Sequence, residues 1–404
     1  MLLRIAAVVV FLTMLSTAAT WEKARPTVAP PQHAIAVVGT ATAREIPRLL
    51  RSTWQGYKTD EIQSDGRVID HGRAGVSTSE GQSYALLRAA WMDDRPTFAR
   101  VWTWTQDNLG VRSDKLFGYL WGRRGDGRWT ILDTASATDA DEDIALALVF
   151  AARRWHDDTY LQQARAIMQD IWRVEVVVVH GAPYLTAGSW APAYTKPGPA
   201  LNPSYFAPYA YRIFAGIDPA HQWMRLVDGS YHALTACSLS PLRSGGSVGL
   251  PPNWCAIRRA TGGVAPITGI KQGDVYGYDA FRVMWRVALD SLWNREPRAK
   301  AYLDGSAFLR QQWRRKGMLS AYTHTGAVVG APDVPLFYGA DIGAFVVSDP
   351  TAARAITTRK LLPLFHQQDG VAYWDQRYSY YEQNWIWFGV AMVGGALPNL
   401  ASST

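Results

Sequence analysis

Three carboxylic acids stand where the sequence predicts helices to begin: Glu80 in STSEGQSY (77–84), Asp139 in SATDAD (136–141) and Asp279 in YGYDAFR (276–282). Each also has a purely structural explanation. Ser77 with Glu80, and Thr138 with Asp141, have the spacing of a capping box, and an Asp at the position of Asp279 is a fair N-cap. Taken singly, each acid is explained more simply as a helix cap than as a catalyst.

Gathered at one opening, the same acids could cleave a glycosidic bond. That reaction needs one protonated carboxyl group for the leaving oxygen and one ionised carboxylate. Because a helix N-terminus favours the ionised form, an acid placed there needs burial or a like-charged neighbour to raise its pKa. We therefore expect Asp139 to supply the neighbouring negative charge for Glu80.

The elements that must position these acids are helices, because apolar residues recur at helical spacing along most of the chain. The predicted helices are 44–57, two that begin near 84 and 98, 138–154, 158–174, 203–217, 221–236, 279–292, 297–315, 336–347, 351–365 and 378–393. The clearest strand is 175–179. Twelve helices in six hairpins predict an all-α (α/α)6 barrel, with an open helical solenoid as the alternative. In a barrel, the three acids would begin inner helices at the same rim.

Composition narrows the class of protein. The chain has 404 residues, of which 48% are hydrophobic, enough for one large domain or two. Its net charge of +7 comes from scattered basic residues, whereas a nucleic-acid-binding protein would show a basic stripe. The 18 Trp and 19 Tyr could serve as platforms for sugar rings or as ordinary core residues.

The N-terminal residues indicate export. Residues 1–19 contain Arg4, an apolar run at 5–15 and then small residues, which is typical of a secretory signal peptide; an uncleaved N-terminal anchor is the alternative. Residues 20–43 are rich in Pro and Ala and predict a linker, followed by a folded domain over 44–398. We expect a periplasmic or extracellular protein.

The two cysteines, Cys237 and Cys255, are compatible with one disulfide in an oxidising compartment or with two buried free thiols. Two cysteines cannot form a zinc site alone, and the eight histidines lack ligand-like spacing. We therefore expect no metal ion.

Four motifs together resemble glycoside hydrolase family 8: TSEGQSY (78–84), SATDAD with DIA (136–145), NPSY (202–205) and YDAFR (278–282). The resemblance runs from about residue 56 to about residue 395 and is nearest to bacterial endoglucanases associated with cellulose biosynthesis. It implies a catalytic domain with an (α/α)6 barrel, an open groove for β-1,4-glucan and an inverting mechanism without a cofactor.

The resemblance also implies individual roles. Glu80 matches the proton donor of the family, Asp279 the general base of the subfamily that includes cellulases, and Asp139 the acid that contacts the distorted sugar. In an inverting enzyme, the two carboxyl groups of Glu80 and Asp279 should lie about 6.5–9.5 Å apart. Arg282, one turn after Asp279, could hold that carboxylate ionised, or could form a plain structural ion pair.

Further residues are candidates for stacking on glucose or hydrogen-bonding to it, although each aromatic among them could equally be a core residue. The candidate substrate-binding residues are Tyr119, Trp121, Asn202, Tyr205, Tyr278, Arg282, Tyr380 and Tyr381. Tyr119 occupies a place that relatives often fill with Trp.

Other functions keep parts of this pattern. The same mechanism could act on chitosan, xylan or mixed-linkage β-glucan, although a positive net charge disfavours cationic chitosan. The chain could instead be a non-catalytic glucan-binding protein that assists polymer export. A polysaccharide lyase would need a Tyr or His base and basic residues, which three acids do not provide. We expect a monomer that acts on a polysaccharide and associates with cellulose-synthesis machinery.

Overall fold

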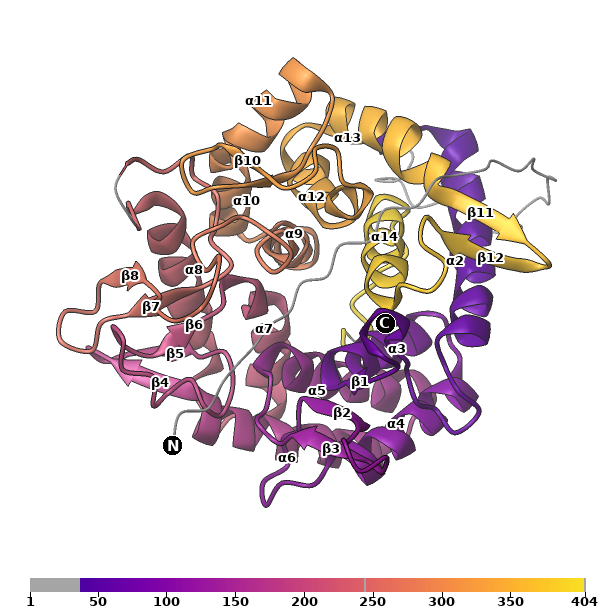
Figure 1. Ribbon diagram of the computed structural model, residues 1–404, viewed down its shortest axis with the longest axis horizontal. Coiled ribbons are helices and arrows are strands. Elements are labelled where there is room, and N and C mark those ends of the chain that lie inside the picture. The colour runs from indigo at the N-terminus through magenta and orange to yellow at the C-terminus, as the bar shows by residue number, and fades with distance from the viewer. Residues whose placement is uncertain (1–36, 243–244, 403–404) are drawn as a thin grey trace.

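Helices wind around a common centre as an inner and an outer ring in the computed structural model, which describes residues 37–242 and 245–402 (Figure 1). The inner ring consists of α3 (Ser79–Trp91), α5 (Thr138–Trp155), α7 (Pro208–Ile217), α9 (Arg282–Asn294), α12 (Pro335–Ser348) and α14 (Tyr380–Val393). The outer ring consists of α2 (Thr40–Asp60), α4 (Arg95–Leu109), α6 (Asp158–Glu175), α8 (Trp223–Leu239), α10 (Pro297–Gly305) and α13 (Pro350–Ile356). The chain alternates between the rings, which confirms the predicted (α/α)6 barrel.

The two rings differ in how their helices are buried. In α5 every residue from 138 to 152 is buried, and in α12 every residue from 336 to 346. Such helices are surrounded by neighbours on all sides. In α6, by contrast, the buried residues fall on one stripe, which includes Ala164, Ile167, Met168 and Ile171. The outer helices therefore cover the inner ring with one face and expose the other.

Three predicted helices are wrong as continuous elements. The segment 203–217 begins as a 3-10 turn, Pro203–Tyr205, and α7 starts only at Pro208, because the residue before a proline is disfavoured in the α conformation. The segment 297–315 breaks after Gly305, and the added helix α11 (Ala307–Lys316) belongs to neither ring. The segment 351–365 is an α-helix only to Ile356 and continues as a π-helical stretch, Thr357–Leu361, and a 3-10 turn, Leu362–Leu364.

The first helix, α2, begins at Thr40, four residues earlier than expected. The last four residues of the predicted linker are therefore helical. The predicted signal peptide, 1–19, and the linker up to residue 36 lie outside the described residues. Within the described part, no helix combines the length and the apolar character needed to cross a membrane.

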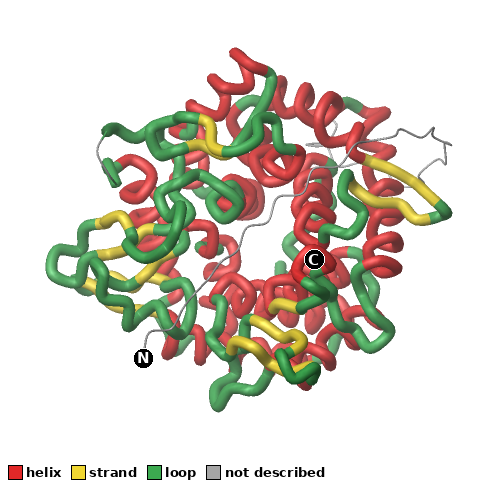
Figure 2. Tube along the Cα trace, in the orientation of Figure 1, coloured by secondary structure: helices red, strands yellow, loops and turns green. Residues whose placement is uncertain are grey.

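Strands form short hairpins around the helical rings and do not build one large sheet (Figure 2). The two three-stranded antiparallel sheets are β1 (Ser77–Thr78), β2 (Leu120–Arg123) and β3 (Trp129–Asp133), and β6 (Ala200–Leu201), β7 (Cys255–Ile257) and β8 (Val264–Pro266). The two-stranded hairpins are β4 (Val176–Val179) with β5 (Ala182–Leu185), β9 (Ala321–Tyr322) with β10 (Val328–Val329), and β11 (Phe365–Gln368) with β12 (Val371–Trp374). The predicted strand 175–179 is confirmed from Val176.

Cys237 and Cys255 form a disulfide, which settles the alternative left open by the sequence. It joins the outer helix α8 to strand β7.

Glycines let neighbouring inner helices approach through their backbones. A Cβ atom on Gly389 of α14 would overlap the carbonyl oxygen of Gly339 in α12. A Cβ atom on Gly343 would likewise overlap the carbonyl oxygen of Met284 in α9. Helix α12 is thus fitted between α9 and α14 without side chains at these crossings.

We predict that Gly389→Ala lowers the free energy of unfolding by about 1–3 kcal/mol, because the added methyl group forces two buried backbones apart. Gly216→Ala is the matched control: Gly216 is an exposed helical residue of α7, and its added Cβ meets nothing within 4 Å. The control should be neutral or gain up to about 1 kcal/mol. Urea denaturation measures both changes, and equal effects would contradict the close crossing.

Candidate active site

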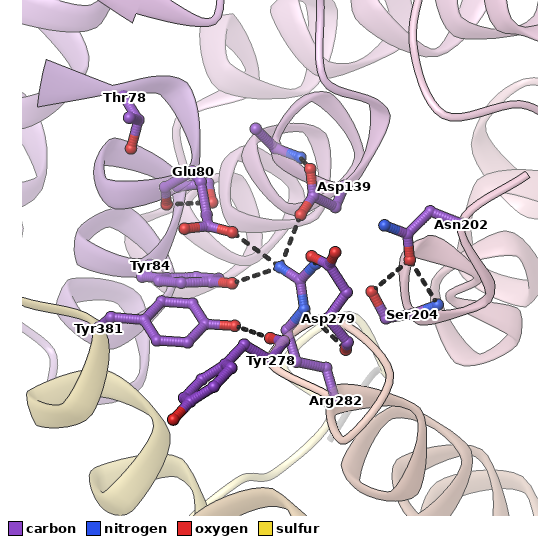
Figure 3. A network of polar contacts seen from close by, with 12 residues as sticks. Thr78, Glu80, Tyr84, Asp139, Asn202, Ser204, Tyr278, Asp279, Arg282 and Tyr381 are labelled. Carbon is purple, nitrogen blue, oxygen red and sulfur yellow. Dashed lines mark hydrogen bonds and ion pairs between the residues drawn. The ribbon is translucent and has the colours of Figure 1, made fainter. Parts of the chain in front are cut away.

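Arg282, the first residue of α9, bonds to all three acids that the sequence singled out (Figure 3). Its Nη1 lies 2.7 Å from Glu80 Oε2 and 2.9 Å from Asp139 Oδ2, and its Nη2 lies 2.8 Å from Asp279 Oδ1. The acids come from the starts of α3 and α5 and from the turn before α9. The expectation that they meet at one rim is therefore confirmed.

The capping box predicted for Ser77 and Glu80 is wrong. Thr78 is the N-cap of α3, and its Oγ1 accepts a 3.0 Å hydrogen bond from Gly81 N. Ser77 instead donates to the carbonyl oxygen of Val68 at 2.6 Å. Because Thr78 caps the helix, the carboxylate of Glu80 is available to the site.

The capping box predicted for Thr138 and Asp141 is also wrong. Thr138 donates to the carbonyl oxygen of Thr186 at 2.8 Å, and Asp141 accepts from Phe117 N at 3.0 Å. Both side chains thus connect α5 to other segments. Asp139 accepts from Ala140 N with Oδ1 (2.9 Å) and reaches Arg282 with Oδ2.

Asp279 is not an N-cap either, because α9 begins three residues later. The backbone N–H of Asp279 instead donates to Asn253 Oδ1 at 3.2 Å. The carboxylate of Asp279 accepts from Arg282 at Oδ1 and from Trp254 Nε1, 3.1 Å away, at Oδ2. Sequence reasoning missed Asn253 and Trp254, because no local spacing links them to Asp279.

Burial raises the pKa of Glu80 to about 7. Arg282 and the hydroxyl of Tyr380, which donates to Glu80 Oε1 at 2.8 Å, oppose this shift, whereas the negative charges of Asp139 and Asp279 add to it. A carboxyl group that keeps its proton near neutral pH can act as a general acid. The contribution of Asp139 has the direction that the sequence predicted.

Burial also raises the pKa of Asp279, against the opposing effect of Arg282 and the hydrogen bond from Trp254. The side chain of Asp279 is 33% exposed and that of Glu80 17%, whereas Asp139 and Arg282 are 2% and 1% exposed. Glu80 and Asp279 are therefore the two acids open to a substrate, and Asp139 and Arg282 lie beneath them. The predicted separation of the two open carboxyl groups stays a prediction.

The predicted tyrosines mostly lie beside this cluster. Tyr380 donates to Glu80 Oε1. Tyr381 donates to the carbonyl oxygen of Tyr278 at 2.6 Å, beside Asp279 (Figure 3). The ring centroid of Tyr205 is 5.3 Å from Arg282 Cζ. Tyr84, which the sequence did not single out, accepts from Arg282 Nη1 at 3.2 Å.

Asn202, Tyr119 and Trp121 have different surroundings. Asn202 Oδ1 accepts from Ser204, and the side chain of Asn202 lies near enough to Asp279 to lower the pKa of that carboxyl group. The hydroxyl of Tyr119 accepts from Arg73 at 3.2 Å. Trp121 stacks on Trp129, with ring centroids 5.0 Å apart. Trp121 also contacts Trp104 and the guanidinium of Arg67, and its role in substrate binding stays a prediction.

Among the described residues, no group of three or more His, Cys, Asp or Glu side chains is arranged to hold a metal ion.

The fold and the site define a class: (α/α)6-barrel proteins with an acid cluster at one rim of the inner ring. Residues 32–385 match the family described as glycosyl hydrolases family 8, and the chain belongs to this family.

Similar proteins agree with this assignment. An endoglucanase from Xanthomonas axonopodis pv. citri (strain 306) is 37% identical over 244 residues, which cover 59% of this chain and 60% of the relative. The chain thus spans less than two thirds of that relative's length. The endo-1,4-D-glucanase from Vibrio fischeri ES114 has a TM-score of 0.70 at 24% identity, covering 84% of this chain and 94% of the other. The β-1,3-1,4-glucanase from Paenibacillus sp. X4 has a TM-score of 0.74 at 19% identity, covering 92% of this chain and 95% of the other. These two structures support the fold alone.

If Glu80 is the general acid, we predict that wild-type activity falls as pH rises through about 7, because a general acid must be protonated and the pKa of Glu80 lies there. Asp139→Asn removes a charge that raises the pKa of Glu80, so the alkaline limit of kcat/KM should move to lower pH. Asp158→Asn, an exposed acid in the first turn of α6, is the control. An unchanged alkaline limit in Asp139→Asn would reject the electrostatic role.

Proposed function

We propose that this protein is an endo-acting glycoside hydrolase that cleaves β-1,4-glucan with inversion, with Glu80 as general acid and Asp279 as general base. The observation that carries the proposal is the contrast between two solvent-open carboxyl groups. Glu80 retains a proton near neutral pH, and one of its oxygens faces the hydroxyl of Tyr380, which can accept as well as donate. Both oxygens of Asp279 face groups that can only donate, Trp254 Nε1 and Arg282 Nη2. Donors stabilise the ionised form. The endoglucanase relatives support the same activity.

The contacts of Glu80 indicate which oxygen carries the proton. Oε2 accepts from Arg282, which cannot accept a proton in return. Oε1 is bonded to the hydroxyl of Tyr380, which can donate or accept. The proton of Glu80 therefore resides on Oε1, from which it passes to the glycosidic oxygen as the bond to the anomeric carbon breaks.

Asp279 acts on the other side of the sugar. It takes a proton from a water molecule as the water oxygen bonds to the anomeric carbon from the face opposite the leaving group. Each cycle leaves Glu80 ionised and Asp279 protonated, and exchange with solvent restores both. Asp139, beneath Glu80, keeps the pKa of the acid high. No cofactor takes part in this scheme.

A second candidate keeps the mechanism and changes the polymer. The alternative substrates are mixed-linkage β-glucan, xylan and chitosan, and the positive net charge of the chain disfavours cationic chitosan. Comparing the release of reducing sugar from carboxymethylcellulose, barley β-glucan, xylan and chitosan separates these substrates.

We also propose that the protein is exported and acts as a monomer, in association with cellulose-synthesis machinery. The apolar run at residues 5–15 supports export, as does the buried disulfide, since such bonds persist in oxidising compartments. Fractionation of cells that express the chain with and without residues 1–19 tests export.

We predict that Glu80→Gln lowers kcat on a soluble cellulose derivative by about 10²–10⁴-fold, because the amide cannot protonate the leaving oxygen. Glu45→Gln is the control, since Glu45 is a half-exposed residue of α2 paired with Arg48. If purified wild type and Glu80→Gln release sugar equally, catalysis at Glu80 is wrong. If neither releases sugar while both bind glucan, the non-catalytic glucan-binding function is correct.

The stereochemical prediction concerns the first product formed. Proton NMR during hydrolysis of a β-linked cello-oligosaccharide should show the α-anomer at the new reducing end before mutarotation, because inversion uses water directly. Initial appearance of the β-anomer would instead indicate a covalent intermediate.

A further inference from the structure

The segment Asn253–Cys255 contacts the turn that carries Asp279 and links it to the outer ring. Each of its three residues makes a different kind of contact: a backbone cap, a hydrogen bond to the carboxylate, and a disulfide.

Asn253 holds the backbone of the turn. Its Oδ1 accepts from three N–H groups, those of Gly277 (3.1 Å), Asp279 (3.2 Å) and Ala280 (3.0 Å). A side chain on Gly277 would press against Asn253, since an added Cβ would lie 2.9 Å from Nδ2. Asn253 therefore fixes the backbone of the turn before α9, and the carboxylate of Asp279 takes no part in these three bonds.

Trp254 holds the carboxylate. Its Nε1 donates to Oδ2 while Arg282 donates to Oδ1, so the two donors fix the orientation of the carboxylate plane. An indole N–H can only donate, and it therefore favours the ionised form that a general base requires. The ring is held by its neighbours Trp190 and Tyr205, whose centroids lie 5.9 and 6.1 Å away.

Cys255 anchors the segment. It is fully buried and joined to Cys237, which is also fully buried, in α8. In strand β7, Cys255 pairs with Leu201 of β6, and Leu201 is followed directly by Asn202. The disulfide thus attaches the sheet β6–β7–β8, which flanks Asp279, to the outer helix α8.

We propose that Asn253 and Trp254 are positioning residues for the general base Asp279, and that the Cys237–Cys255 disulfide holds them in place, so that full activity requires the oxidised protein. The inference rests on the proposed function and deepens it. Reduction by a dithiol would convert the disulfide to two thiols while the dithiol is oxidised to its own disulfide, a transfer of two electrons and two protons.

Trp254→Phe tests the positioning role, since it keeps an aromatic ring and removes the donor. The acid limit of kcat/KM should rise by about 0.5–1 pH unit, because the ionised form of Asp279 loses one hydrogen bond. The alkaline limit, which reports Glu80, should stay in place, and kcat should fall more than KM changes. The control is Trp172→Phe, because Trp172 belongs to the outer helix α6 and stacks on His221. An unmoved acid limit would overturn the role of Trp254.

The disulfide is tested with reduced wild type, produced in a reducing cytoplasm and verified by thiol titration, and with Cys237→Ala/Cys255→Ala. Both should keep the circular dichroism of the oxidised protein, lose about tenfold in kcat, and shift the acid limit in the direction of Trp254→Phe. Reoxidation should restore the kcat and the acid limit of the reduced wild type, but it should not change those of the double variant. A folded reduced protein with unchanged kcat and acid limit would overturn the anchoring role.

These tests separate the two proposals. Absence of glycosidase activity in oxidised wild type would reject the proposed function itself. An active wild type with unshifted variants would reject only the inference. If the double variant fails to fold, Trp254→Phe and Asn253→Ala still decide the positioning role through the acid limit.

Discussion

One guanidinium group stands between three carboxylates that would otherwise repel one another. Arg282 is buried, and its planar fork reaches all three at once, which the single ammonium of a lysine could not do with the same geometry. A second pair continues the pattern one helical turn deeper, where Arg286 makes two hydrogen bonds to Asp143. Helices α5 and α9 are thus joined by two successive arginine–aspartate contacts. The first of these, Arg282 with Asp139, lies beneath the two exposed acids.

This arrangement divides the acids by exposure. Glu80 and Asp279 open to solvent and can touch a polymer, while Asp139 is covered. A covered carboxylate is of little use as a proton carrier, but its charge acts at short range where water does not screen it. The rim therefore separates the two acids proposed to exchange protons from the acid whose negative charge raises the pKa of Glu80.

The sequence was informative about the barrel and the acids, because both depend on patterns within short segments. Helical periodicity predicted the two rings, and the motifs around Glu80, Asp139 and Asp279 predicted the cluster. The capping assignments failed because Thr78 caps α3 and Asn253 holds the turn before α9, which local spacing alone could not reveal. Trp254 was missed because its hydrogen bond to Asp279 depends on how the sheet β6–β7–β8 folds back on the barrel, which no local pattern encodes.

The closure of the inner ring by α14 has a consequence for biosynthesis. Helix α14 provides Tyr380 and Tyr381, and it fastens to the first described helix through Trp387, whose indole donates to Leu50 O. While α14 is still inside the ribosome, helices α3 and α12 each lack a neighbour on one side. Tyr380 and Tyr381 are then missing from the site. The ring can therefore close only after α14 has left the ribosome, so the site is completed later than the helices that carry Glu80, Asp139 and Asp279 are made.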